Sequence, residues 1–151
     1  MPNHPFNQTV HDTVDPICRQ VVIEYFKQKE FDFHSNPDIY GVDLLSDGAQ
    51  IGLELEHRDI WCGDTYKYQT YHFLQRKEHF FKESKTFKPY FIVINSDYTH
   101  GMMINKERIL PHLREDNLKQ IQCWDYNRGG YYKDLVFDVP ISEFIPLHLN
   151  N

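Results

Sequence analysis

The chain has little cysteine and no recognisable metal-binding histidine pattern. Its three cysteines, Cys18, Cys62 and Cys123, are odd in number and show no C-x-x-C spacing, so neither a disulfide framework nor a zinc ribbon is supported. The nine histidines are scattered without an H-E-x-x-H motif or another paired zinc pattern. We therefore expect reduced, structural cysteines and histidines that are mostly ordinary polar residues.

The chain also lacks any apolar run of about 18 residues, the length that a membrane-spanning helix needs. Residues Met1 to Val10 have no apolar core of the kind found in signal peptides. Positive charge is in deficit, because 16 lysines and arginines stand against 22 acidic residues, a net charge of −6. These observations predict a soluble cytoplasmic protein with no membrane partner, and they argue against a general nucleic-acid-coating protein.

What the chain does have is the length and aromatic content of one packed domain, with 151 residues of which 15% are aromatic. We expect a single domain over residues 1–151, in which residues 1–11 form an extended arm. Apolar spacing predicts a helix from about Thr13, which can cap it, to about Tyr25. A second helix is predicted over Leu74 to Ser84.

Strand patterns surround these helices. One predicted strand ends near His72, a buried strand covers Tyr90 to Asn95, and Gly101 to Asn105 is its expected partner. A second hairpin is expected between Gln120 to Asp125 and Tyr131 to Val139. Short helical turns are predicted over Glu107 to Leu113 and over Ser142 to Phe144. This order predicts an α+β (mixed α/β) fold with a central mixed β-sheet flanked by helices.

The most informative segment is the predicted β-hairpin over Ile39 to Arg58. Asp47-Gly48 lies between two alternating apolar runs, a pattern that favours a two-residue type I′ turn. In that register Asp43 pairs with Gly52, and opposed residues point to the same side of the sheet. One face of the hairpin is then apolar and the other is acidic.

The acidic face predicts a metal site. Asp43, Glu54 and Glu56 share it, with Asp43 and Glu54 as diagonal neighbours whose Cβ atoms lie within roughly 7 Å, while Gly52 leaves the space beside them unfilled. A simply solvated polar face is the alternative. Adjacent like charges destabilise a sheet, however, and Arg58 is the only obvious counter-charge on this face. We therefore expect Mg²⁺ or Mn²⁺, which prefer carboxylate oxygens.

The order of these motifs resembles the PD-(D/E)XK nuclease superfamily over roughly Glu24 to Asn95. The residues that carry the resemblance are Pro37-Asp38, Gly41-Val42-Asp43-Leu44 and Leu53-Glu54-Leu55-Glu56, between a helix holding Glu24 and a helix starting Gln75-Arg76-Lys77. The resemblance implies a restriction-endonuclease-like fold and a Mg²⁺ site with Asp43 and Glu54 as ligands. Asp38 is a rival for the position of Asp43.

Glu56 departs from the motif, because it occupies the position of the superfamily's lysine. Some restriction enzymes of the superfamily carry glutamate there, and Lys77, or Arg76 beside it, is then the candidate to supply the missing cation. Glu56 would be a third metal ligand or a general base acting through water. Arg58 and Arg76 would bind phosphate, although a solvated helix surface also explains the basic pair at positions 76 and 77.

The leading hypothesis is thus a Mg²⁺-dependent nuclease, an enzyme that hydrolyses phosphodiester bonds of DNA or RNA. The alternative is a catalytically inactive nuclease-like domain that binds nucleic acid or a protein partner. A metal-binding structural domain is the least supported, because no D-x-D-x-D-G loop is present. Nucleases that cleave both strands of DNA with one active site per chain often form dimers with two-fold symmetry. A homodimer is therefore a candidate assembly.

Overall fold

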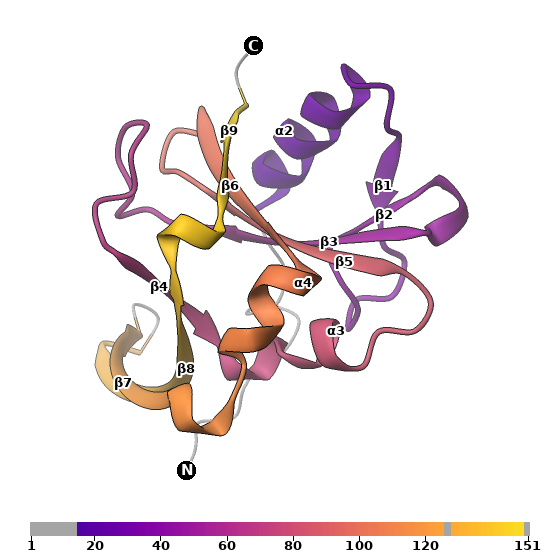
Figure 1. Cartoon of the computed structure of the whole chain (residues 1–151). Helices are drawn as coiled ribbons and strands as arrows, with labels where there is room; N and C mark the ends of the chain where they lie inside the picture. Colours follow the sequence, from indigo (N-terminus) through magenta and orange to yellow (C-terminus); the bar gives the residue numbers. More distant parts are fainter. Residues whose placement is uncertain (1–14, 126–127, 150–151) are drawn as a thin grey trace.

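Residues 15–125 and 128–149 are described by a computed structural model, in which two β-sheets and several short helices pack together (Figure 1). One sheet has six strands and the other has three. The predicted α+β class is therefore confirmed. The predicted arm over residues 1–11 and the predicted cap Thr13 lie outside the described residues. None of the described helices combines the length and the apolar composition that a membrane crossing requires.

Helix α2 (Pro16–Lys27) begins later than the sequence predicts. Asp15 is its N-cap, and a carboxylate oxygen of Asp15 accepts a hydrogen bond of 2.8 Å from the backbone N–H of Ile17. Asp15 satisfies one of the first free N–H groups, and Pro16 suits the first helical position because it has no N–H to satisfy. The buried face of α2 packs against the six-stranded sheet.

The six-stranded sheet has the order β1-β2-β3-β5-β6-β9. Strands β3 and β5 are parallel and every other neighbouring pair is antiparallel, so the sheet is mixed. The predicted pairing of the strands near residues 90–95 and 101–105 is confirmed as β5 with β6. The strands of this sheet are β1 (Phe33–Ser35), β2 (Leu44–Ser46), β3 (Ile51–His57), β5 (Lys88–Ile94), β6 (His100–Asn105) and β9 (Ile145–His148).

The second sheet has the order β4-β8-β7 and is antiparallel throughout. Its strands are β4 (Thr70–Leu74), β7 (Leu118–Asp125) and β8 (Gly130–Pro140). The predicted hairpin near the C-terminus is confirmed as β7 with β8, although part of its turn lies outside the described residues. Three short helical segments follow β6, namely α4 (Lys106–Ile109) and the 3₁₀ turns η3 (Leu110–His112) and η4 (Glu115–Asn117).

The predicted continuous helix over Leu74 to Ser84 is wrong. Leu74 is the last residue of β4, where it pairs with β8. A 3₁₀ turn, η2 (Gln75–Lys77), and a single helical turn, α3 (His79–Lys82), follow it. Strand pairing has overridden the helical spacing of the apolar residues. Near the C-terminus, the expected helical turn is the 3₁₀ turn η5 (Ile141–Glu143), and strand β9 after it was not predicted.

The hairpin of β2 and β3 is formed, but its predicted register is wrong by two residues. Gly52 pairs with Leu45 and not with Asp43, because the turn is the wider segment η1 (Asp47–Ala49). In this turn the positive φ angles belong to Gly48 (80°) and Ala49 (54°). Side chains alternate with a period of two, so a two-residue shift keeps every side chain on its predicted face.

Apolar clusters cover both faces of the six-stranded sheet. Leu53 and Leu55 of β3 pack with α2, whereas Phe91 and Val93 of β5 pack with the second sheet. The register of the parallel pair places Glu54 beside Phe91. The carboxylates of β3 therefore lie on the face that the second sheet covers.

Candidate active site

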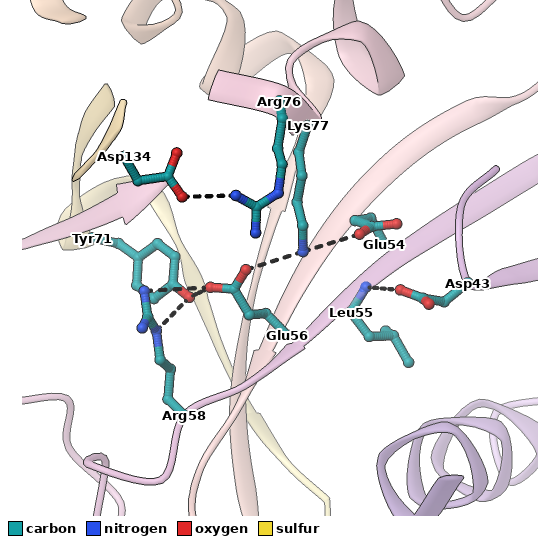
Figure 2. Close-up of polar contacts among 9 residues, drawn as sticks. All are labelled: Asp43, Glu54, Leu55, Glu56, Arg58, Tyr71, Arg76, Lys77 and Asp134. Atoms are coloured by element: carbon teal, nitrogen blue, oxygen red, sulfur yellow. Dashed lines mark hydrogen bonds and ion pairs between the residues drawn. The ribbon is translucent and has the colours of Figure 1, made fainter. Parts of the chain in front are cut away.

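The site is assembled where the β3–β5 crossover returns over the face of β3 (Figure 2). Parallel strands need a crossover connection, and this one carries β4, η2 and α3. It brings the Nζ atom of Lys77 to 3.0 Å from an oxygen of Glu54 and 3.0 Å from an oxygen of Glu56. Their side chains are only 12%, 5% and 15% exposed, respectively. Three charged groups thus meet in a largely buried space.

Asp43 joins this cluster from the residue before β2. Its Oδ2 atom accepts a hydrogen bond of 2.8 Å from the backbone N–H of Leu55. Continuation of the β2–β3 register places Asp43 directly opposite Glu54. The two carboxylates that the sequence predicts as neighbours therefore lie opposite each other on the two strands.

The pKa of Glu54 is raised well above its ordinary value. Burial is the main cause, the charge of Asp43 adds to it, and the Lys77 ammonium opposes it. Burial also raises the pKa of Asp43, and the hydrogen bond from the N–H of Leu55 and the charge of Lys77 partly counteract this shift. Burial therefore shifts both neighbouring carboxyl groups toward their protonated forms, and it does so more strongly for Glu54 than for Asp43.

Glu56 is ionised and fixed by positive partners. Burial raises its pKa, but the charges of Lys77 and Arg58 outweigh burial and lower it. Its Oε1 atom accepts a hydrogen bond from the hydroxyl of Tyr71 and lies 3.4 Å from Arg58 Nη2. The Nε–H of Arg58 in turn donates to the Tyr71 hydroxyl oxygen over 2.8 Å. Glu56 is directed toward two cations and not toward Asp43.

Lys77 carries its positive charge at neutral pH. Burial lowers its pKa, but the carboxylates of Glu56, Glu54 and Asp43 together raise it above the ordinary value. The prediction that Lys77 lies in the first turn of an α-helix is wrong, because it ends the 3₁₀ turn η2. Its ammonium nevertheless reaches Glu56.

The two predicted phosphate-binding arginines border the cluster. Arg58 is 31% exposed and Arg76 is 35% exposed. Arg76 Nη1 lies 2.7 Å from Asp134 Oδ2, which connects η2 to β8. No sequence pattern indicates that Asp134 and Tyr71 belong to this network, because both lie in the second sheet and only long-range pairing brings them here.

Two other predicted candidates lie away from the cluster. Asp38 is exposed in the turn before β2, where its carboxylate accepts a hydrogen bond of 3.0 Å from the N–H of Tyr40. Glu24 is exposed on α2, which packs on the opposite face of the six-stranded sheet, and is hydrogen-bonded to Gln20. Asp43 is therefore the better placed of the two aspartates.

The expected convergence of Asp43, Glu54 and Glu56 on one ion is not what the side chains show. Across residues 15–125 and 128–149, no group of three or more His, Cys, Asp or Glu residues is arranged to hold a metal ion. The Lys77 ammonium lies between Glu54 and Glu56, as Figure 2 shows. The pair of Asp43 and Glu54 is left as the donor set that fits a hard divalent cation.

No protein-family model matches the chain, and no curated protein matches it in sequence. Its function is therefore inferred from the chemistry of the cluster.

Proposed function

We propose that the chain is a metal-dependent nuclease that hydrolyses phosphodiester bonds in DNA or RNA. The observation that carries the proposal is the buried contact of Lys77 with both Glu54 and Glu56, beside the carboxyl pair of Glu54 and Asp43. Clusters of buried carboxylates and a cation with shifted pKa values are typical of functional sites. The motif order that resembles the PD-(D/E)XK superfamily supports the same reaction.

Asp43 and Glu54 are the residues that would hold Mg²⁺ or Mn²⁺. Both supply the oxygen ligands that these ions prefer. Burial raises the pKa of both carboxyl groups, and a divalent cation beside them would favour their ionised forms and reduce the repulsion between them. Such a cation, when bound, lowers the pKa of water and neutralises charge on the phosphate.

The chain's own cations have distinct roles in this proposal. Lys77 takes the part of the motif lysine, so that its ammonium donates a hydrogen bond to the attacking water or to a phosphate oxygen. Glu56 keeps Lys77 charged and oriented, with Tyr71 and Arg58 holding Glu56 in turn. In this proposal the partly exposed guanidinium groups of Arg58 and Arg76, at the edge of the cluster, bind phosphate.

A cleavage assay tests this function. Labelled single- and double-stranded DNA and RNA are incubated with the full chain and Mg²⁺ or Mn²⁺. We expect cleavage that EDTA abolishes and that Asp43→Asn reduces by at least about 100-fold, since metal catalysis supplies several kcal/mol. Asp47→Asn, an exposed change in the neighbouring turn, is the matched control and should leave the rate unchanged.

The assay has a defined contrary outcome. If the wild-type chain cleaves none of these substrates with either metal, the enzyme proposal is wrong. The inactive nuclease-like domain that binds nucleic acid or a protein is then the remaining hypothesis. Cleavage of both strands at one position would imply a two-fold dimer, which light scattering would detect.

A cytoplasmic location stays a prediction from the sequence.

A further inference from the structure

A second polar site lies at the start of strand β5, outside the carboxylate cluster. It is a pocket of about 390 Å³. Its lining includes three lysines, one glutamate and two hydroxyl residues, which are Lys85, Lys88, Lys106, Glu107, Ser84 and Thr86. The pocket thus concentrates positive charge in a chain whose net charge is −6.

The positive charge in this pocket is poorly neutralised. Lys88 Nζ lies 3.9 Å from Glu107 Oε1, and both side chains are more than half exposed, so this pair contributes little. Lys85 and Lys106 form no ion pair with any residue in the described part of the chain. Two ammonium groups are therefore available to an anion.

The pocket adjoins the face of β3 that carries the carboxylates. Phe87 and Pro89 line it, and Pro89 is the register partner of Gly52. A Cβ atom at Gly52 would lie 2.5 Å from the Phe87 ring, so that ring packs directly on the glycine. Gly52 precedes Glu54 by two residues on the same face, which is roughly 7 Å along a strand.

We infer that this pocket binds a backbone phosphate of the nucleic-acid strand that occupies the carboxylate cluster. The identity of the ligand rests on the proposed function. Ammonium and hydroxyl groups are typical phosphate contacts. Because the pocket would contact only the sugar-phosphate backbone, it would add affinity for nucleic acid without a preference for its sequence.

Binding without cleavage tests the pocket. The affinity of the full chain for a labelled DNA duplex is measured by fluorescence anisotropy in EDTA over a range of KCl concentrations. We expect Lys85→Gln/Lys106→Gln to weaken binding at every salt concentration and to reduce the slope of log K against log[KCl] by about 1 per lysine. The control variant Lys27→Gln/Lys29→Gln changes two exposed lysines near the end of α2. It has the same net charge as Lys85→Gln/Lys106→Gln and should bind as wild type does.

The outcomes separate this inference from the proposed function. Equal affinity and slope in the two double variants, with cleavage retained, would overturn the pocket and leave the nuclease. Weakened binding only in Lys85→Gln/Lys106→Gln, with no cleavage by the wild-type chain, would support the pocket and overturn the nuclease. A wild-type chain that neither binds nor cleaves nucleic acid would overturn both.

Discussion

Lys77 is the main counter-charge of Glu56 in a largely buried space, and its ammonium also contacts Glu54. Each of its two contacts with Glu54 and Glu56 is 3.0 Å long. A buried ion pair is weak evidence for stability, because desolvation offsets the attraction, but loss of one partner leaves an uncompensated charge. Removal of Lys77 should therefore reduce the stability of the fold by more than the intact ion pairs contribute to it.

Substitution of Lys77→Met should destabilise the fold by about 3–5 kcal/mol, because it leaves Glu56 buried without its main counter-charge. The free energy of unfolding in urea measures this. Lys82→Met is the matched control, since Lys82 pairs with Glu78 at a site where it is 41% exposed, and its effect should be within about 0.5 kcal/mol. Equal losses in both variants would contradict the assigned role of Lys77.

The raised pKa of Glu54 predicts a pH dependence. The folded state favours the protonated carboxyl, so the contribution of Glu54 to stability is largest below its ordinary pKa of 4.5 and declines as pH rises from there toward the folded-state pKa. The pKa of Glu56 is lowered, so its contribution is lost only at lower pH. The contribution of Glu54 to stability therefore changes above pH 4.5, and the contribution of Glu56 changes below pH 4.5.

Unfolding free energies measured in EDTA from pH 4.5 to pH 8 test the window of Glu54. Wild type should lose stability across this range relative to Glu54→Gln, which has no proton to lose there. If both proteins show the same pH slope, burial does not raise the pKa of Glu54 above its ordinary value.

At the scale of elements, the loop before β5 packs closely against strand β3 at Gly52. The Phe87 ring fills the space that a side chain at position 52 would need. The hairpin pattern predicts an unfilled space beside Asp43, whereas Gly52 lies opposite Leu45 and packs against Phe87. The absence of a side chain at Gly52 therefore allows the Phe87 ring to pack against strand β3.

Gly52→Ala should reduce stability by about 1–3 kcal/mol through overpacking against Phe87. Gly130→Ala is the control, because a Cβ atom there meets nothing within 4 Å, and we expect a change below about 0.5 kcal/mol. Thermal unfolding compares the two. Recovery of stability in Gly52→Ala/Phe87→Leu would support the contact, and an unaffected Gly52→Ala would contradict it.

The elements also show where sequence patterns suffice. Alternation along β3 places Glu54 and Glu56 on one face because side chains repeat every two residues, and that prediction survives an error of two in the register. The wide turn over Asp47–Ala49 escapes prediction, because the dipeptide Asp47-Gly48 also suits a two-residue turn. The segment after Leu74 has a helical pattern that pairing with β8 overrides.

At the scale of the whole molecule, burial of the site depends on contacts between distant segments. The second sheet covers the carboxylate face of β3, and its Tyr71 and Asp134 hold Glu56 and Arg76. The order of helices and strands predicts the α+β class, but no local pattern indicates that β4, β7 and β8 form a separate sheet. The acidic residues of the site could thus be predicted, whereas their partners in the second sheet could not.

The central claim is that Asp43 and Glu54 together bind a divalent cation. Calorimetric titration of the full chain with Mn²⁺ tests it most directly, with Asp43→Asn as the ligand variant and Asp47→Asn as the exposed control. We predict saturable binding by wild type and by Asp47→Asn, and its loss in Asp43→Asn. Absence of Mn²⁺ binding by wild type, or equal binding by Asp43→Asn, would contradict the claim.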